Sequence, residues 1–371
     1  MSLIHRVSIL VKLDDDPNPR TCYCIVKEKS DEAFGAALMD VLSVFEKERD
    51  VYENLLPSFE RLWAARGRPE VRFGPKLLKC TDGPEFTVIV MEDLTRSQFR
   101  MRDQPYNLPL LDMKRILSKL AKFHATSLVH CERAGAFSGH FLSGVITEHT
   151  VELLKGYYEV LFRAFVQSLR ERQFPDQYLT PLASLEDRLL TECCQLYKVD
   201  NSELNVLNHG DLWPNNVMFG DDDLLFLDYA TVFYSSFAGD LLYVFATSCA
   251  ELICDSLDAL LEHYYGSLAE SFDLLGSSRA LPSTASLTEQ LKRRGVLILP
   301  TLTEALAISM AKLTETNDLQ TVISDSREGE ALRRRVFNNP AFVALIDRLV
   351  PTLFEKGFFS SLKGAGALKS L

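Results

Sequence analysis

The hydrophobic pattern near the N-terminus is that of β-strands. Arg6–Lys12 and Thr21–Lys27 are rich in valine, isoleucine and tyrosine, and the Asp- and Pro-rich residues 14–19 lie between them. Such a pattern predicts a β-hairpin. Lys76–Cys80 and Phe86–Met91 predict two further strands on either side of a second turn.

One helix is predicted between these two pairs of strands, over residues 34–56. Its apolar positions step by three and four residues, as on one face of an amphipathic helix; they are Leu38, Val41, Phe45, Tyr52 and Leu55. We expect Pro57 to end the helix, because proline cannot continue the backbone hydrogen bonding.

From Leu110 onward the pattern is mostly helical, with clear periods at Val151–Leu169 and Leu182–Tyr197. Two short apolar runs, Val217–Phe219 and Leu224–Leu227, interrupt it and predict a second hairpin. A chain of 371 residues is long for one hydrophobic core. The sequence therefore predicts an α+β protein with two lobes, a small antiparallel sheet with one helix and a large helical lobe.

Composition excludes several classes of partner. The net charge is −11 and the pI is about 5.2, so the surface repels nucleic-acid phosphates and anionic lipids. The eight cysteines show no zinc-binding spacing and are expected to be free thiols in a reducing compartment. The longest apolar run, Leu241–Cys254, has the length of a buried helix rather than a membrane span. We expect a cytoplasmic protein that binds neither nucleic acid nor membranes.

The richest concentration of candidate chemistry surrounds the second hairpin. Asp211 precedes Asn216 by five residues, Asn216 enters the first strand, and Asp228 follows the second. A turn centred on 221–222 would put Asn216 opposite Leu227, and facing positions lie about 5 Å apart. An amide oxygen and a carboxylate would then reach one Mg²⁺ ion, with a second carboxylate nearby to accept a proton. His-Gly-Asp alone is a common turn, so the combination carries the prediction.

These residues also resemble a known family. The segments HGDLWPNNVMF at 209–219 and LLFLDYA at 224–230 are similar to the ecdysteroid-kinase-like (choline-kinase-like) family, which shares the protein-kinase fold. The resemblance covers nearly the whole chain. It implies ATP and Mg²⁺ as cofactors, with Asp211 as the catalytic base and Asn216 and Asp228 as metal ligands.

The resemblance further implies a hinge between the lobes at VIVMEDL, residues 88–94. There the backbone of Glu92, Asp93 and Leu94 would contact adenine. The expected domains are therefore a nucleotide-binding lobe at 1–94 and a helical lobe at 95–371 that carries the catalytic loop and the metal-binding hairpin.

Glu48 offers a check that depends on the residues alone. It falls on the apolar face of the predicted helix, where a carboxylate is costly unless it is paired. Lys27, at the end of the preceding strand, is the natural partner, as in the lysine–glutamate pair with which kinases hold phosphates. Alternatively Glu48 turns outward to water and Lys27 is an ordinary surface lysine. The family pattern FxxExxxY, here Phe45, Glu48 and Tyr52, agrees with the pair.

Other candidates have ordinary structural explanations. His124 fits a core histidine, and Asp240 fits a helix N-cap. Four tyrosines could line a pocket for the second substrate, although aromatic residues at helical spacing usually belong to the core; they are Tyr157, Tyr158, Tyr229 and Tyr234.

Two features depart from the family. Tyr229-Ala230 follows the metal aspartate where Phe-Gln is more common. Members also usually carry a strand and a phosphate-covering loop before the position where this chain starts, and no glycine precedes Gly35. The N-terminal lobe is therefore expected to lack both, and its sheet to have an unpaired edge near Arg6–Lys12.

Three functions remain open on the sequence. The first is an ATP-dependent phosphotransferase acting on a small ecdysteroid-like or choline-like alcohol. The second is a protein kinase, against which HGD in place of HRD and the lack of an APE-like segment both argue. The third is a catalytically weak or inactive binding protein on a kinase scaffold, because of the shortened N-terminal lobe.

Overall fold

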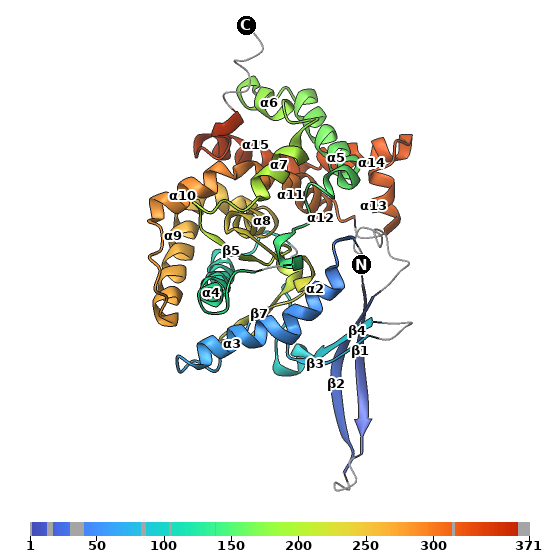
Figure 1. Ribbon diagram of the computed structural model, residues 1–371. Coiled ribbons are helices and arrows are strands. Elements are labelled where there is room, and N and C mark those ends of the chain that lie inside the picture. Colours follow the sequence, from blue (N-terminus) through green and yellow to red (C-terminus); the bar gives the residue numbers. More distant parts are fainter. Residues whose placement is uncertain are drawn as a thin grey trace.

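The computed structural model describes residues 2–12, 18–29, 41–82, 87–103, 106–137, 139–313 and 316–362. It has a small antiparallel sheet near the N-terminus, at the bottom of Figure 1, and a large helical part above it. The predicted α+β, protein-kinase-like architecture is confirmed.

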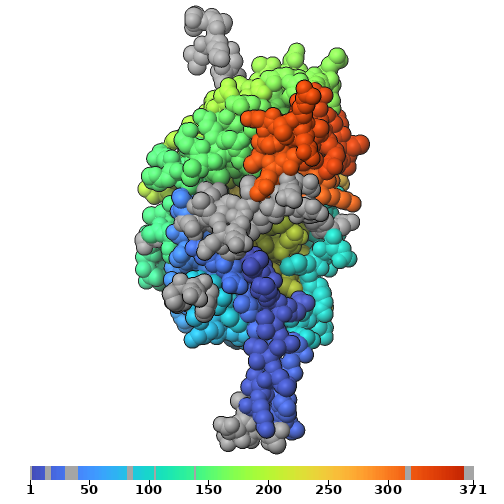
Figure 2. Space-filling view, turned by 90° about the vertical axis from the view of Figure 1, so that its right-hand side faces the viewer, coloured from blue at the N-terminus to red at the C-terminus, as the bar shows by residue number. Residues whose placement is uncertain are grey.

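The sheet contains four strands in the order β1-β2-β4-β3, all antiparallel. They are β1 (Ser2–Val11), β2 (Arg20–Lys29), β3 (Leu77–Asp82) and β4 (Thr87–Glu92). All ten residues of β1 pair with β2, whereas only Cys24–Glu28 of β2 pair with β4. The outer half of the hairpin consequently extends beyond the sheet (Figure 2). Within the described residues β1 is an edge strand, as the sequence predicted.

The helix of the N-terminal part continues past Pro57, so the prediction that proline ends it is wrong. It runs through α2 (Val44–Asp50), a π-helical turn η1 (Val51–Leu55) and α3 (Leu56–Ala64). Pro57 lies in the first turn of α3, where its missing N–H leaves no hydrogen bond unmade. The π-helical turn directly before Pro57 shifts the backbone hydrogen bonds of the helix by one residue, so that a new first turn contains the proline. The predicted start of this helix lies outside the described residues.

The helical part begins after the 3₁₀ turn η2 (Leu94–Ser97). Its longer helices are α4 (Leu110–Ala134), α5 (Val151–Glu171), α6 (Asp176–Ala183), α7 (Leu189–Tyr197), α8 (Ala238–Ser248), α9 (Ala250–Leu275), α10 (Thr284–Arg293), α14 (Arg327–Phe337) and α15 (Pro340–Glu355). The shorter ones are η3 (Gly139–Leu142), η6 (Gly295–Leu297), α11 (Ile298–Thr301), the π-turn η7 (Leu302–Leu306), α12 (Ala307–Met310), α13 (Thr316–Val322) and η8 (Ser360–Leu362).

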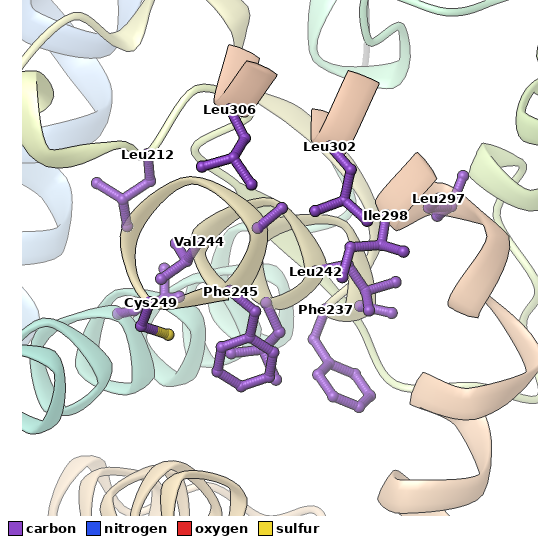
Figure 3. Close-up of a cluster of buried hydrophobic side chains, with 14 of the residues drawn as sticks. Leu212, Phe237, Leu242, Val244, Phe245, Cys249, Leu297, Ile298, Leu302 and Leu306 are labelled. Atoms are coloured by element: carbon purple, nitrogen blue, oxygen red, sulfur yellow. The ribbon is translucent and has the colours of Figure 1, made fainter. Parts of the chain in front are cut away.

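The core of the helical part surrounds α8. Leu242 and Phe245 of this helix are buried, and Leu242 lies beside Ile298 of α11 (Figure 3). The apolar run Leu241–Cys254 is thus a core segment, divided between α8 and α9. No helix in the described ranges is both long and apolar enough to cross a membrane.

Two small β-pairs interrupt the helices and carry the candidate residues. One joins β5 (Asn205–Asn208) to β8 (Phe233–Ser236), and the other is the hairpin of β6 (Val217–Phe219) and β7 (Leu224–Phe226). The 3₁₀ turns η4 (Pro214–Asn216) and η5 (Tyr229–Thr231) connect the two pairs. The segment 209–216 is therefore fixed at both ends by strands.

Candidate active site

Asp240 holds the segment that contains the His-Gly-Asp motif. Its carboxylate is fully buried and accepts hydrogen bonds from the backbone N–H groups of His209 (2.6 Å) and Gly210 (2.9 Å). The Nε2 atom of His124 lies 3.0 Å from the same carboxylate, and the Nδ1 atom of His124 lies 2.7 Å from the hydroxyl of Tyr264. His124 is thus a satisfied core histidine, as predicted. The prediction that Asp240 is the N-cap of α8 is wrong, because this residue lies in the first turn of the helix and its oxygens bind the backbone of His209 and Gly210.

Gly210 is needed for the shape of this segment. Its φ angle is +84°, in the left-handed region that favours glycine. A Cβ atom added here would lie 2.3 Å from the carbonyl oxygen of Thr231, a backbone atom that cannot move aside cheaply. The motif therefore uses glycine so that the chain can pass close to η5.

The β6–β7 hairpin brings Asn216 and Asp228 together. Val217 pairs with Phe226, and the N–H of Leu227 donates to the carbonyl of Asn216 at 2.9 Å. Asn216 thus faces Leu227, and the predicted register is confirmed. Asp228 has φ 60°, which is uncommon for any residue other than glycine. A strained backbone of this kind persists where the surroundings enforce it, often at functional sites.

Asp211 is held by two side chains. The Tyr243 hydroxyl donates to its Oδ1 at 2.5 Å, and the Asn216 amide donates to its Oδ2 at 3.0 Å. Burial raises the pKa of Asp211 to about 7, although both hydrogen bonds act in the opposite direction. The side chain is thereby oriented, and its proton affinity is close to that of an effective general base at neutral pH.

Lys27, Glu48 and Asp228 form a buried ionic group between the sheet and the hairpin. The Lys27 ammonium lies 2.6 Å from Glu48 Oε2 and 2.9 Å from Asp228 Oδ1. Lys27 is 4% exposed and Glu48 1%. Burial alone would lower the pKa of Lys27, but the two carboxylates more than offset it, so that its pKa is raised. The predicted Lys27–Glu48 pair is present, and the alternative of two solvated side chains is wrong.

A cleft of about 250 Å³ opens beside this group. Its walls include apolar side chains of both the sheet and the hairpin, and four polar residues line it as well: Lys27, Glu48, Asn216 and Asp228. The apolar residues are Ile4, Ile25, Met91, Leu94, Met218 and Leu227. An elongated ligand with a flat apolar ring and an anionic tail would match this arrangement.

Glu92, Asp93 and Leu94 line the same cleft, and two of their side chains have structural partners. Glu92 pairs with Arg72 and accepts from the Lys76 N–H at 3.1 Å. Asp93 caps η2 by accepting from the Thr95 N–H at 3.1 Å. The contact of the backbone of Glu92, Asp93 and Leu94 with adenine stays a prediction.

A second cleft, of about 180 Å³, lies on the other side of Asp211. It is lined by aromatic rings together with Asp211 and Glu304; the rings are Tyr158, Tyr197, Phe233 and Tyr243. Because Asp211 also bonds to Asn216 of the first cleft, the two clefts adjoin.

Asn216 and Asp228 have the chemistry of magnesium ligands. The Asn216 amide nitrogen is engaged by Asp211, which leaves its oxygen as the group that can coordinate a cation. Within the described ranges no three His, Cys, Asp or Glu side chains gather closely enough to hold a metal by themselves. Magnesium fits such a sparse set, because it usually takes one or two protein oxygens and completes its shell with phosphates and water.

Sequence reasoning missed four of the aromatic and acidic residues that line the second cleft. Tyr243 lies one helical turn after Asp240, a spacing that could have placed it beside residues 209–211. Glu304 interrupts the apolar run 296–310 and is a buried carboxylate signal like that of Glu48. Tyr197 and Phe233 carried no local signal. Of the four tyrosines considered from the sequence, Tyr158 lines this cleft, and the other three are not among its lining residues.

The N-terminal part contains a buried lysine–glutamate pair, and the helical part contributes Asp211 and the hairpin that carries Asn216 and Asp228. This combination is typical of kinase-like phosphotransferases. Within this class, the chain belongs to the ecdysteroid kinase-like family, whose model matches residues 1–277. No curated protein matches the chain significantly.

Solved structures resemble the chain over most of its length. A choline kinase from Cryptosporidium parvum Iowa II has a TM-score of 0.44 and 13% identity, covering 97% of this chain and 94% of that one. Amicoumacin kinase hAmiN, solved with AMP-PNP, Ca²⁺ and Ami, has a TM-score of 0.40 and 11% identity over 90% and 88%. A choline/ethanolamine kinase family protein from Mesorhizobium loti has a TM-score of 0.37 and 13% identity over 93% and 92%.

Proposed function

We propose that the protein transfers the γ-phosphoryl group of ATP to a hydroxyl group of a small organic molecule. The observation that carries this proposal is the position of Asp211, which lines the aromatic cleft and is hydrogen-bonded to Asn216 of the cleft that contains Lys27 and Asp228. One carboxylate thus lines the cleft suited to a second substrate and accepts a hydrogen bond from a residue that lines the cleft suited to a nucleotide.

The first cleft binds ATP in this proposal. Adenine lies between the apolar walls and meets the hinge backbone at Glu92, Asp93 and Leu94. Lys27, held by Glu48, contacts the phosphates. Asn216 and Asp228 would hold Mg²⁺, which would offset the negative charge of the phosphates. We also propose that the nucleotide-binding lobe ends at residue 94 and that the helical lobe begins at residue 95.

The transfer itself needs little covalent work from the protein. The acceptor oxygen forms a bond to the γ-phosphorus while the bond from that phosphorus to the β–γ bridging oxygen breaks, and ADP leaves with that electron pair. The hydroxyl proton moves to Asp211, whose other contacts hold it in position: Tyr243 on Oδ1 and Asn216 on Oδ2. General-base assistance of this kind contributes about 10²–10⁴ in rate.

Comparing ATP binding with ATP turnover tests the proposal. Titrating the protein with ATP·Mg²⁺ measures binding, and following ADP formation in the presence of a panel of small alcohols measures transfer. Acceptor-dependent ADP formation supports the proposal. Tight ATP binding with no acceptor-dependent turnover on any alcohol would instead identify a kinase-fold binding protein.

A further inference from the structure

The aromatic cleft beside Asp211 has an unbalanced charge. Two carboxylates, Asp211 and Glu304, line it, and no lysine, arginine or histidine of the described residues does. Lys27 lies in the other cleft and already has two carboxylate partners, and the Lys47 ammonium donates to the carbonyl of Ser143. Anionic groups that are withdrawn from water are costly unless a cation faces them.

Glu304 is held so that it faces this cleft. It lies on the π-helical turn η7, an irregularity that often occurs at functional sites. The Tyr157 hydroxyl donates to its Oε1 at 3.1 Å. Burial raises the pKa of Glu304, and the Tyr157 hydrogen bond only partly counters it. A cation in the cleft would supply the missing stabilisation of the charged form.

The remaining walls suit an organic cation. The rings of Tyr197 and Phe233 meet edge to face, with centroids 5.4 Å apart. Tyr158 and Tyr243 also line the cleft. Aromatic faces attract ammonium groups through their quadrupole, most strongly where water is excluded.

The cleft is also small. It measures about 180 Å³, and both carboxylates and all four rings line it. A short alkyl amine placed in this cleft would therefore lie close to the two carboxylates.

From these observations, and on the basis of the proposed phosphotransferase function, we infer that the acceptor is a small alcohol carrying a positively charged amine. The amine lies among the aromatic rings with Glu304 as its counter-ion, and the hydroxyl group points to Asp211. Glu304 is thus a specificity-determining residue for the amine.

Binding measured without ATP tests this inference separately from catalysis. The probes are choline, ethanolamine and tetramethylammonium, together with the tert-butyl analogue of choline, in which an uncharged carbon replaces the nitrogen. Isothermal titration calorimetry should show at least one amine binding about tenfold or more tighter than the uncharged analogue, because charge pairing and cation–π attraction both require the positive charge. The Glu304→Gln variant should bring that ratio close to one.

Glu262→Gln is the matched control, since Glu262 is exposed on α9, and it should keep the wild-type ratio. Wild-type binding alone decides the matter if Glu304→Gln does not fold. The inference is overturned if no amine binds better than the uncharged analogue, or if a steroid alcohol binds and the amines do not. Amine binding without any phosphoryl transfer would contradict the proposed function and leave the amine site standing.

Discussion

Replacing Glu48 with glutamine tests the buried ionic group directly. The change keeps the size of the side chain and removes its charge, while Lys27 stays buried with Asp228 at 2.9 Å. Removing one partner from a buried ion pair costs about 3–5 kcal/mol. Because Lys27 retains Asp228 and the glutamine retains an acceptor oxygen, we expect a loss of about 2–3 kcal/mol, below that range.

Glu46 provides the control for this experiment, because it is exposed on the same helix, α2. Glu46→Gln should change the free energy of unfolding by no more than about 0.5 kcal/mol. Urea denaturation of both variants and of the wild type measures the difference. If both variants lose the same free energy of unfolding, the charge of Glu48 does not stabilise the fold. That result would refute the reasoning about the buried ionic group.

The same variant should also weaken ATP·Mg²⁺ binding. Without Glu48, the Lys27 ammonium has only Asp228 as a carboxylate partner, so it is drawn toward the proposed metal ligand and away from the phosphates. Calorimetric titration with ATP·Mg²⁺ measures this effect, and unchanged affinity would remove Lys27 from phosphate binding.

Three further substitutions give separate outcomes. Asp211→Asn should lower turnover by a factor on the order of 10² or more with ATP affinity nearly unchanged, as steady-state kinetics would show; comparable turnover would exclude it as the base. Asp228→Ala should weaken nucleotide binding only when Mg²⁺ is present, as titrations with and without the metal would measure. If the affinity falls equally in both titrations, Asp228 is not a metal ligand. Burial lowers the pKa of Lys47 to about 8, so between about pH 8 and 10 the unfolded chain binds more protons at this residue than the folded one. The wild type should therefore gain stability relative to Lys47→Met as the pH rises through this range, by up to about 1.4 kcal/mol per pH unit, and a constant difference in urea denaturation would contradict this.

Local patterns in the sequence were sufficient to predict the elements of the nucleotide cleft. The hairpin register followed from its turn, and the Lys27–Glu48 pair followed from a single carboxylate on an apolar helix face. Both depend on short-range regularities that the fold preserves. Pro57 was misjudged because a π-turn can move a proline into a new first turn, and no residue type in the sequence marks such a turn.

The aromatic cleft could not be predicted in the same way. Its walls come from segments far apart in the chain, including Tyr158 on α5, Tyr197 at the end of α7 and Glu304 on η7. Each residue lies in an ordinary helical pattern when viewed alone. Only the packing of these helices around α8 brings them to Asp211, and packing of this kind depends on many weak contacts rather than on a motif.

The most direct test of the central proposal is to detect the phosphorylated product. Purified protein is incubated with ATP·Mg²⁺ and a panel of amine-bearing, neutral and steroid alcohols, and mass spectrometry measures ADP and any phosphorylated alcohol. We predict one phosphorylated alcohol per ADP in the wild type and in Asp222→Asn, a control on the exposed turn of the hairpin, and a loss on the order of 10²-fold or more in Asp211→Asn. ATP binding with no phosphorylated alcohol from any member of the panel would contradict the account.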